Sequence, residues 1–420
     1  MKRRLRHKSL VLCLVACALL GGGQAACAGS VDEVQAGQSA EPEPVHADFQ
    51  SFLSSIWPLA EARGVSRKTF DAALSGLTFD PSTPKPSTAQ AEFDRPLPAY
   101  LAAAVSKSRL ERGRAALRRY ALEFEEIERK FGVPREILIA AWGMESDFGR
   151  FRGSKDIIRS LASLAFLRED RSLFLDELLS ALVMLDSGKI ARDKMKGSWA
   201  GAMGDPQFLP SAYLKYGVGF TGSAFPDIWD TPPDSLASIA NFLAQSGWQR
   251  DLPWGMEIVI PANFDFASLH RSFPAWASLG LRSADARALP DHGEATLFLP
   301  SGAQGPAFLL SDNYWVLKQY NNSDSYALSL AWLAHLLRGG QGLHGQWPMG
   351  EPMLSRAQKA EIQHRLELMG FYKGVIDGRF GQTSRDAIHA YQISIGEAPA
   401  DGYASPALLL RLTQDRHDPR

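Results

Sequence analysis

Apolar positions recur at helical spacing through most of the first 250 residues of this 420-residue chain. Residues 110–132, 161–188 and 234–248 each carry apolar side chains three and four positions apart, and the first two stretches end at Gly132 and Gly188. The second stretch has a polar break at residues 168–170. Glycine is typical of a helix end because it adopts the left-handed backbone without a Cβ penalty. These stretches therefore predict amphipathic helices that pack through one face.

A different pattern occupies residues 252–318, where short β-branched and aromatic runs alternate with Pro, Gly and Asp. MEIVIPANF, ATLFLP and AFLLS predict strands of a small sheet. Helical spacing returns before residue 338. We therefore predict a mainly α (α+β) fold, in which residues 47–338 form one helical domain with a β-rich insertion at about 252–318.

The C-terminal part predicts a separate small module. Residues 339–353 are rich in Gly and Pro and predict a linker. Residues 354–413 carry amphipathic helices around the turn VIDGRFGQT, and ADGYASPALLLRL repeats the D-G-turn-helix theme. Two related halves in such a short segment predict a compact three-helix module that is too small for a large pocket.

The N-terminus has the three parts of an export signal: basic MKRRLRHK, apolar SLVLCLVACALL and small residues in GGGQAACAG. Cleavage after Ala28 would make 1–28 a signal peptide and 29–46 a flexible leader, and would remove all three cysteines. The alternative is an outer-membrane lipid anchor at Cys17, because LVAC resembles a bacterial lipidation box. Soluble export to the periplasm is preferred, because more apolar sequence follows Cys17.

Charge and composition narrow the classes of ligand. The formal net charge is −1, which argues against a broad nucleic-acid surface but leaves an uncharged polar polymer open. The nine histidines include no H-E-x-x-H motif and no cluster with metal-ligand spacing, so we predict neither a metal nor a cofactor. We expect a monomer.

The stretch AWGMESDFG places one carboxylate, Glu145, in an apolar run. Pro134 suits the first position of a helix, and Ile137, Ala141 and Glu145 then share one face. Burial would raise the pKa of this carboxyl group and keep it protonated as a general acid.

A structural role is the alternative for Glu145, as an acid near a helix end that pairs with Arg150 or Arg152. Asp147 lies two positions further on and would point away if the helix continued, so the two acids would not form a flanking pair. Glu145 is therefore predicted to be a single acid.

The segment MKGSWAGAMGDPQFLPSAYLKYG, residues 195–217, combines glycines, uncharged hydrogen-bonding side chains and aromatic rings. This mixture suits a sugar, which has hydroxyl groups to bond and apolar faces to stack. Taken alone, a tightly packed helix-turn-helix segment explains it equally well.

Four stretches in this order, GMESDFGRFRG, GSWAGAMGDPQFLPSAYLKYGVGF, DIWDTPPDSLASIANFLAQSGW and VLKQYNNSDSYALSLAWLAHLL, closely resemble the lytic murein transglycosylases of the B type. The resemblance covers most of residues 47–338. The tail IQHRLELMGFYKGVIDGRFGQTSRDAIHAYQ resembles the peptidoglycan-binding modules of cell-wall enzymes. Two resemblances to one substrate, with an export signal, favour the catalytic interpretation of Glu145.

The resemblance implies a lysozyme-like domain that cleaves the β-1,4 bond between N-acetylmuramic acid and N-acetylglucosamine in peptidoglycan glycan strands. Glu145 matches the family's single catalytic acid, which protonates the glycosidic oxygen and then acts as base on the muramic acid 6-hydroxyl group. The product is a 1,6-anhydro ring. Because an internal nucleophile has a large effective molarity, a second carboxylate is dispensable.

Further site residues are carried over by position. Ser198 would hydrogen-bond near the catalytic acid and orient it, and Gln207 would contact the sugar. Tyr320 and Asn321 would bind near the scissile linkage. Arg171 is the best match to an arginine of the family, although the segment REDRSLFLDEL is shortened here.

Two positions depart from the family pattern. Some relatives bind calcium in a loop that here reads GFTGSAFPDIWD, with Gly219, Thr221 and Ser223 at the ligand positions and Asp227 as the nearest acidic residue, so calcium is not expected. Asp205 stands where relatives often have Gln or an aromatic residue. We expect it to face solvent at a turn; inside the cleft it could activate water for hydrolysis.

Two rival functions stay open. A lysozyme-type muramidase would need a second carboxylate or an activated water molecule. A non-catalytic peptidoglycan-binding scaffold would keep the cleft without turnover.

Overall fold

The chain divides into two structural units. The computed structural model describes residues 43–83, 95–167, 171–220, 222–223, 225–350 and 352–414, with the backbone alone for residues 43–47 and Arg171. Of these, residues 43–83 and 107–245 form the first unit, and residues 95–106 and 246–414 form the second. The predicted signal peptide lies outside the described residues, and the predicted 47–338 domain spans both units.

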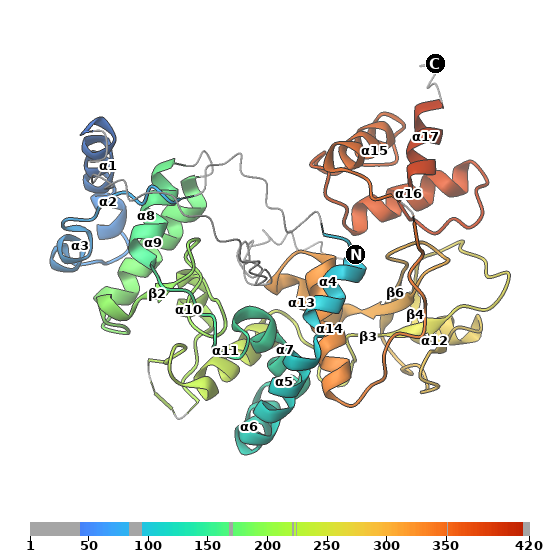
Figure 1. Cartoon of the computed structure of the whole chain (residues 1–420), viewed down its shortest axis with the longest axis horizontal. Helices are drawn as coiled ribbons and strands as arrows, with labels where there is room; N and C mark the ends of the chain where they lie inside the picture. The colour runs from blue at the N-terminus through green and yellow to red at the C-terminus, as the bar shows by residue number, and fades with distance from the viewer. Residues whose placement is uncertain are drawn as a thin grey trace, which may run out of the picture. The chain divides into compact units, whose positions relative to one another are not determined.

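The first unit is built mainly from helices, as the apolar periodicity predicts (Figure 1). Its helices are α1 (Glu43–Ser55), α2 (Trp57–Glu61), α3 (Arg67–Leu74), α5 (Lys107–Arg119), α6 (Ala121–Phe131), α7 (Arg135–Ser146), α8 (Ile157–Leu167), α9 (Arg171–Asp186), a 3-10 turn (Arg192–Lys194), α10 (Pro210–Tyr216) and α11 (Pro232–Gln245). Two short strands, β1 (Lys155–Asp156) and β2 (Lys196–Gly197), pair antiparallel. Helices α8 and α9 pack side by side and carry α1, α2 and α3 on one flank (Figure 1).

Helix ends follow the glycine pattern. Gly132 ends α6 with φ +72°, and Gly188 follows α9 with φ +68°, both in the left-handed region. The predicted helix over 110–132 is wrong in one respect, because the chain breaks at Tyr120, whose φ and ψ are −110° and 32°. No Gly or Pro marks this break in the sequence.

The second unit contains a five-stranded antiparallel sheet in the order β4-β6-β7-β3-β5. The strands are β3 (Gly255–Val259), β4 (His270–Ser272), β5 (Arg282–Ser283), β6 (Glu294–Phe298) and β7 (Ala307–Ser311). The three predicted strands β3, β6 and β7 are confirmed. Helix α12 (Phe273–Ser278) adds Phe273 and Trp276 to the core on one side of the sheet.

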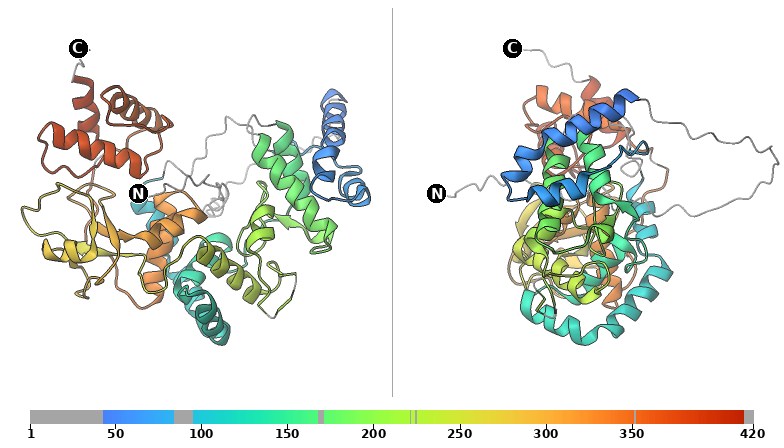
Figure 2. Two further views of the ribbon diagram at one scale, coloured as in Figure 1. Left: turned by 180° about the vertical axis from the view of Figure 1, so that it is seen from behind. Right: turned by 90° about the vertical axis from the view of Figure 1, so that its left-hand side faces the viewer.

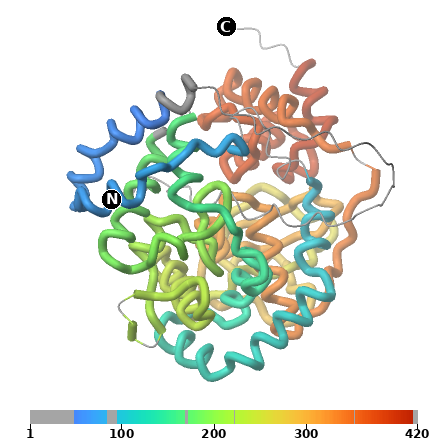
Figure 3. Tube along the Cα trace, turned by 60° about the vertical axis from the view of Figure 1, so that its left-hand side comes forward, coloured from blue at the N-terminus to red at the C-terminus, as the bar shows by residue number. Residues whose placement is uncertain are grey.

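Three further helices belong to the sheet-bearing part of the second unit: α4 (Leu97–Ala104), α13 (Asp312–Tyr320) and α14 (Asp324–Leu337). Helix α14 is buried almost throughout and packs against α13 and α4 (Figure 3). Among the described residues, no helix has the length and apolar character needed to cross a bilayer.

The C-terminal module consists of α15 (Arg356–Leu368), α16 (Gln382–Ser394) and α17 (Pro406–Gln414), as predicted (Figure 2). Its two related halves each use a buried glutamine to hold a D-G turn. Gln363 Oε1 accepts hydrogen bonds from the backbone N–H groups of Asp377 and Gly378, at 3.1 and 2.8 Å. Gln392 Oε1 accepts one from Gly402 N–H at 2.8 Å. The structure therefore contains the internal repeat seen in the sequence.

Candidate active site

Helix α7 carries Glu145 in its last turn. Pro134 immediately precedes the helix at its N-cap, and Ile137 and Ala141 are fully buried along the predicted face. Glu145 itself is 3% exposed. Burial of a carboxylate is costly unless it serves a structural or chemical role. The predicted apolar face of α7 that ends at Glu145 is therefore confirmed. The catalytic role of Glu145 stays a prediction.

The helix ends immediately after Glu145, so Asp147 is not a helical neighbour. Asp147 and Phe148 have φ +50° and +61°, which turns the chain sharply away from the helix. The Asp147 carboxylate accepts a hydrogen bond from Arg112 Nη2 at 2.6 Å and lies 3.7 Å from Arg109 Nε. The Asp147 carboxylate is therefore paired with two arginines of α5.

The glycine-rich block forms a tight series of turns whose closeness requires glycine. A Cβ on Gly153 would lie 2.2 Å from the Gly197 carbonyl oxygen, and one on Gly197 would lie 2.0 Å from the Ala202 carbonyl oxygen. Ser198 Oγ accepts hydrogen bonds from Ala202 N–H at 3.0 Å and Ala200 N–H at 3.3 Å. Ser198 thus stabilises the turn; its predicted orientation of Glu145 stays a prediction.

Gln207 joins this block to the loop that follows α7. It is 6% exposed and adopts φ +50°. Its Nε2 donates to the carbonyl oxygens of Gly204 at 2.9 Å and Arg152 at 3.2 Å. These contacts position the loop after Glu145, and the predicted sugar contact of Gln207 stays a prediction.

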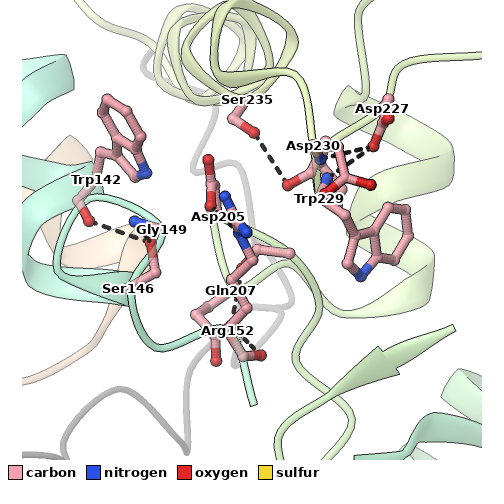
Figure 4. Close-up of polar contacts among 12 residues, drawn as sticks. Trp142, Ser146, Gly149, Arg152, Asp205, Gln207, Asp227, Trp229, Asp230 and Ser235 are labelled. Carbon is pink, nitrogen blue, oxygen red and sulfur yellow. Dashed lines mark hydrogen bonds and ion pairs between the residues drawn. The ribbon is translucent and has the colours of Figure 1, made fainter. Parts of the chain in front are cut away.

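The prediction for Asp205 is wrong: its side chain is fully buried rather than solvent-facing. Arg152 Nε donates to Asp205 Oδ1 at 2.5 Å, and the indole of Trp142 faces the carboxyl group from α7 (Figure 4). Burial raises the pKa of Asp205 to about 6, against the opposing effect of Arg152. A partner 53 positions away, Arg152, turns this residue inward, which local turn propensity does not reveal.

The loop at residues 219–230, where some relatives bind calcium, is held here by the carboxylate of Asp234. Asp234, in the first turn of α11, accepts hydrogen bonds from Phe220 N–H at 2.7 Å and Asp227 N–H at 2.8 Å. Asp227 in turn accepts from Trp229 N–H and Asp230 N–H, both at 3.0 Å. Thr221 lies outside the described residues. Among the described side chains, no group of three or more His, Cys, Asp or Glu could hold a metal ion.

The other predicted residues lie elsewhere in the chain. Tyr320 and Asn321 belong to the second unit, at the end of α13; Tyr320 is 1% exposed and stacks on Tyr326 with 6.4 Å between ring centroids. Arg171 is the first residue of α9, and its side chain lies outside the described residues.

The sequence did not reveal that Arg112 pairs with Asp147, or that Arg152 and Trp142 lie beside Asp205. Arg152 was predicted only as a possible partner of Glu145, and Trp142 without a partner. The one available signal was Asp205 within residues 197–213, whose other side chains are uncharged, since a lone acid there calls for a cation.

Comparisons with known proteins identify the family to which the chain belongs. A model described as the transglycosylase SLT domain matches residues 48–335, and a peptidoglycan binding domain model matches residues 355–412. The chain therefore belongs to the transglycosylase SLT domain family, with the lysozyme-like lytic transglycosylase fold.

The chain is similar to several lytic transglycosylases of known structure or sequence. The chain is 39% identical to SltB3 from Pseudomonas aeruginosa, solved in complex with NAG-anhNAM-pentapeptide, with a TM-score of 0.79 over 87% of this chain and 99% of that one. It is 25% identical to the Escherichia coli lytic transglycosylase Slt35 in complex with bulgecin A, with a TM-score of 0.57 over 70% and 93%. The membrane-bound lytic murein transglycosylase B of Escherichia coli K12 is 32% identical over 206 residues, which span 48% of this chain and 56% of that relative.

Proposed function

We propose that the chain is an exported peptidoglycan lytic transglycosylase. It would cleave the β-1,4 bond between N-acetylmuramic acid and N-acetylglucosamine and leave 1,6-anhydro ends, with Glu145 as acid and then base. Family membership supports this reaction class. So does the relative SltB3, whose bound ligand contains an anhydro-muramic acid.

The observation that carries the mechanism is the burial of the Glu145 carboxyl group in the last turn of α7, where the residue is 3% exposed. The two neighbouring carboxylates are held by arginines: Asp147 by Arg112, and Asp205 by Arg152. An enzyme that activates water normally needs a second carboxylate next to the sugar. A transglycosylase needs none, because its nucleophile belongs to the substrate.

The proposed reaction balances without water. Glu145 donates its proton to the glycosidic oxygen as the bond from that oxygen to C1 of the muramic acid breaks. The 6-hydroxyl oxygen of the same muramic acid then bonds to C1, and its proton passes to the Glu145 carboxylate, which regenerates the acid. Intramolecular attack in a well-oriented geometry corresponds to effective molarities of about 10⁵ to 10⁸ M.

The remaining site residues have proposed supporting roles. Ser198 would orient the acid, Gln207 would contact the sugar, and Tyr320 and Asn321 would bind near the scissile linkage. Arg171 would contact the substrate from the start of α9. The backbone contacts of Ser198 and Gln207 support a role in shaping the site as well.

Export and wall attachment complete the proposal. The N-terminal sequence supports export to the periplasm, with an outer-membrane lipid anchor as the alternative. The C-terminal module would supply a second contact with the polymer and raise the local concentration of the catalytic unit on it. Its family match to a peptidoglycan binding domain supports this role.

A muramidase is the second candidate, and burial of Asp205 counts against it. A base that activates water must reach a water molecule in the cleft, whereas the Asp205 side chain is fully buried and held by Arg152.

The test is the Glu145→Gln variant on purified sacculi. Release of soluble fragments should fall by about 100- to 10,000-fold, the usual contribution of general acid–base catalysis. Binding to sacculi, measured by co-sedimentation, should stay at the wild-type level. Equal release by both proteins would contradict the role of Glu145. Binding without release by the wild type, beside an active control enzyme, would indicate the scaffold.

A further inference from the structure

Asp205 lies beside residues on both sides of Glu145 in sequence. On the N-terminal side, the indole of Trp142, three residues before Glu145 on α7, faces the Asp205 carboxyl group (Figure 4). On the C-terminal side, Arg152 donates from its Nε to Asp205 Oδ1 at 2.5 Å. The Arg152 side chain is 32% exposed, whereas that of Asp205 is 0% exposed. One buried carboxylate therefore pairs with the loop after α7 and lies beside Trp142 of α7.

Two further features hold the loop after α7 against the glycine-rich segment 195–217. Gln207 Nε2 donates to the Arg152 carbonyl oxygen at 3.2 Å. Gly149 has φ +80°, and a Cβ there would lie 2.7 Å from Asp205 Oδ1 and 2.5 Å from Arg152 Nη2. The loop thus approaches Asp205 too closely for any side chain at Gly149. The carboxylate is part of the surface on which the loop rests.

We propose that ionised Asp205 is a positioning residue for Glu145, which it holds in place through its ion pair with Arg152. This inference rests on the proposed function. Asp205 is not a catalytic residue in this account, because its buried side chain cannot touch substrate in the cleft. Small displacements of a reacting group are costly, since an error of about 1 Å can lower a rate by about 100-fold.

The charged groups around Asp205 make this positioning sensitive to pH. Burial raises the pKa of Asp205 to about 6; Arg152, from the loop after α7, opposes the rise, and Asp230, from the loop before α11, adds to it. Asp205 is therefore ionised at neutral pH and gains a proton as the pH falls through about 6. The protonated form would lose the ion pair with Arg152.

The test is a pH profile of kcat and KM on soluble glycan strands between pH 5 and 8. Wild type should lose activity on the acid side near pH 6. Asp205→Asn, which keeps the shape and removes the charge, should lower kcat about 10- to 100-fold at pH 7.5 with little change in KM. Its remaining activity should lack the acid limb.

A second variant separates positioning from folding. Arg152→Gln removes the partner at a partly exposed position and should reproduce both effects. The double variant should be no slower than the slower single variant, because both substitutions break one interaction. Glu177→Gln is the matched control: Glu177 is also a buried acid whose pKa burial raises, but it accepts from Ser211 N–H and Oγ, at 2.9 and 2.6 Å. It should keep the wild-type acid limb.

The outcomes are distinguishable. An active wild type with unchanged kcat and acid limb in Asp205→Asn and Arg152→Gln would overturn the positioning role alone. Additive losses in the double variant would overturn it as well. A wild type that releases no fragments would overturn the proposed function, and this inference with it.

Discussion

Two carboxylates, one in each unit, occupy opposite electrostatic situations. Asp205, in the first unit, has one guanidinium partner, and burial raises its pKa to about 6. Asp324, at the start of α14 in the second unit, is also taken out of water, yet Arg385 and Lys318 outweigh burial and lower its pKa to about 2. Arg385 Nη2 and Lys318 Nζ both lie 2.7 Å from its oxygens.

The two sites differ in the number of cations that contact the buried carboxylate. Two cations stabilise the ionised Asp324, and one of them, Arg385 of α16, comes from the C-terminal module. The pair therefore fastens the module to the sheet-bearing part of the second unit. Asp205 has one cation, and its pKa of about 6 lies close enough to neutral pH for a modest fall in pH to neutralise it. A fully compensated buried charge serves structure, whereas an incompletely compensated one is able to respond to pH.

The largest expected effect is at Asp324. Asp324→Asn would leave two cations without their shared partner and should lower the free energy of unfolding of the second unit by about 3–5 kcal/mol. In the wild type this contribution is present above pH ~3.8 and is lost as the pH falls through about 2, because the pKa is lowered on folding. Urea unfolding at pH 7 measures it.

The matched control for Asp324 is Asp386→Asn. Asp386 pairs with His270, also between the module and the sheet, at 2.9 Å, but both side chains are about half exposed. A change at Asp324 no larger than that at Asp386 would contradict the distinction between compensated and exposed pairs.

The second effect has the opposite sign. Asp205→Asn should raise the free energy of unfolding at pH 8 by up to about 3 kcal/mol, the value of a shift of roughly two pKa units. Since the pKa of Asp205 is raised on folding, its favourable contribution is present below pH ~3.8 and is lost as the pH rises through about 6. Thermal unfolding at pH 5 and pH 8 measures the change. A variant less stable than wild type at pH 8 would show that the ion pair with Arg152 outweighs the cost of burial.

The smallest effect is at His270. The hydrogen bond to Asp386 raises the pKa of His270, so its contribution is present below pH ~6.5 and is lost as the pH rises through the folded-state pKa. Because the pair is exposed, His270→Gln should lower the free energy of unfolding at pH 6 by less than about 1 kcal/mol and have no effect at pH 9. Loss of several kcal/mol, or no pH dependence, would contradict this ranking.

Much of the fold could be predicted because the deciding signals are local. Helical periodicity and Gly132 define the end of α6, and alternating apolar runs define β3, β6 and β7. Glu145 was recognisable because a lone acid interrupts an apolar face. Local signals also explain one failure: nothing in RRYAL distinguishes the break at Tyr120 from continued helix.

The surroundings of the site depend on contacts between distant residues, and these the sequence does not reveal. Asp205 precedes Pro206 in a turn, which favours solvent exposure until Arg152 is placed beside it. Likewise, Arg385 resembles any surface residue of an amphipathic helix, and its partner Asp324 lies 61 positions away. Ion pairs between residues that are far apart in sequence can be identified only when the fold is known.

The most direct test of the central claim is the mass of the fragments released from sacculi by the mature protein. We predict muropeptides one water lighter than hydrolysis products, with ends that resist borohydride reduction. Reducible ends that carry the added water would contradict it and establish a muramidase instead.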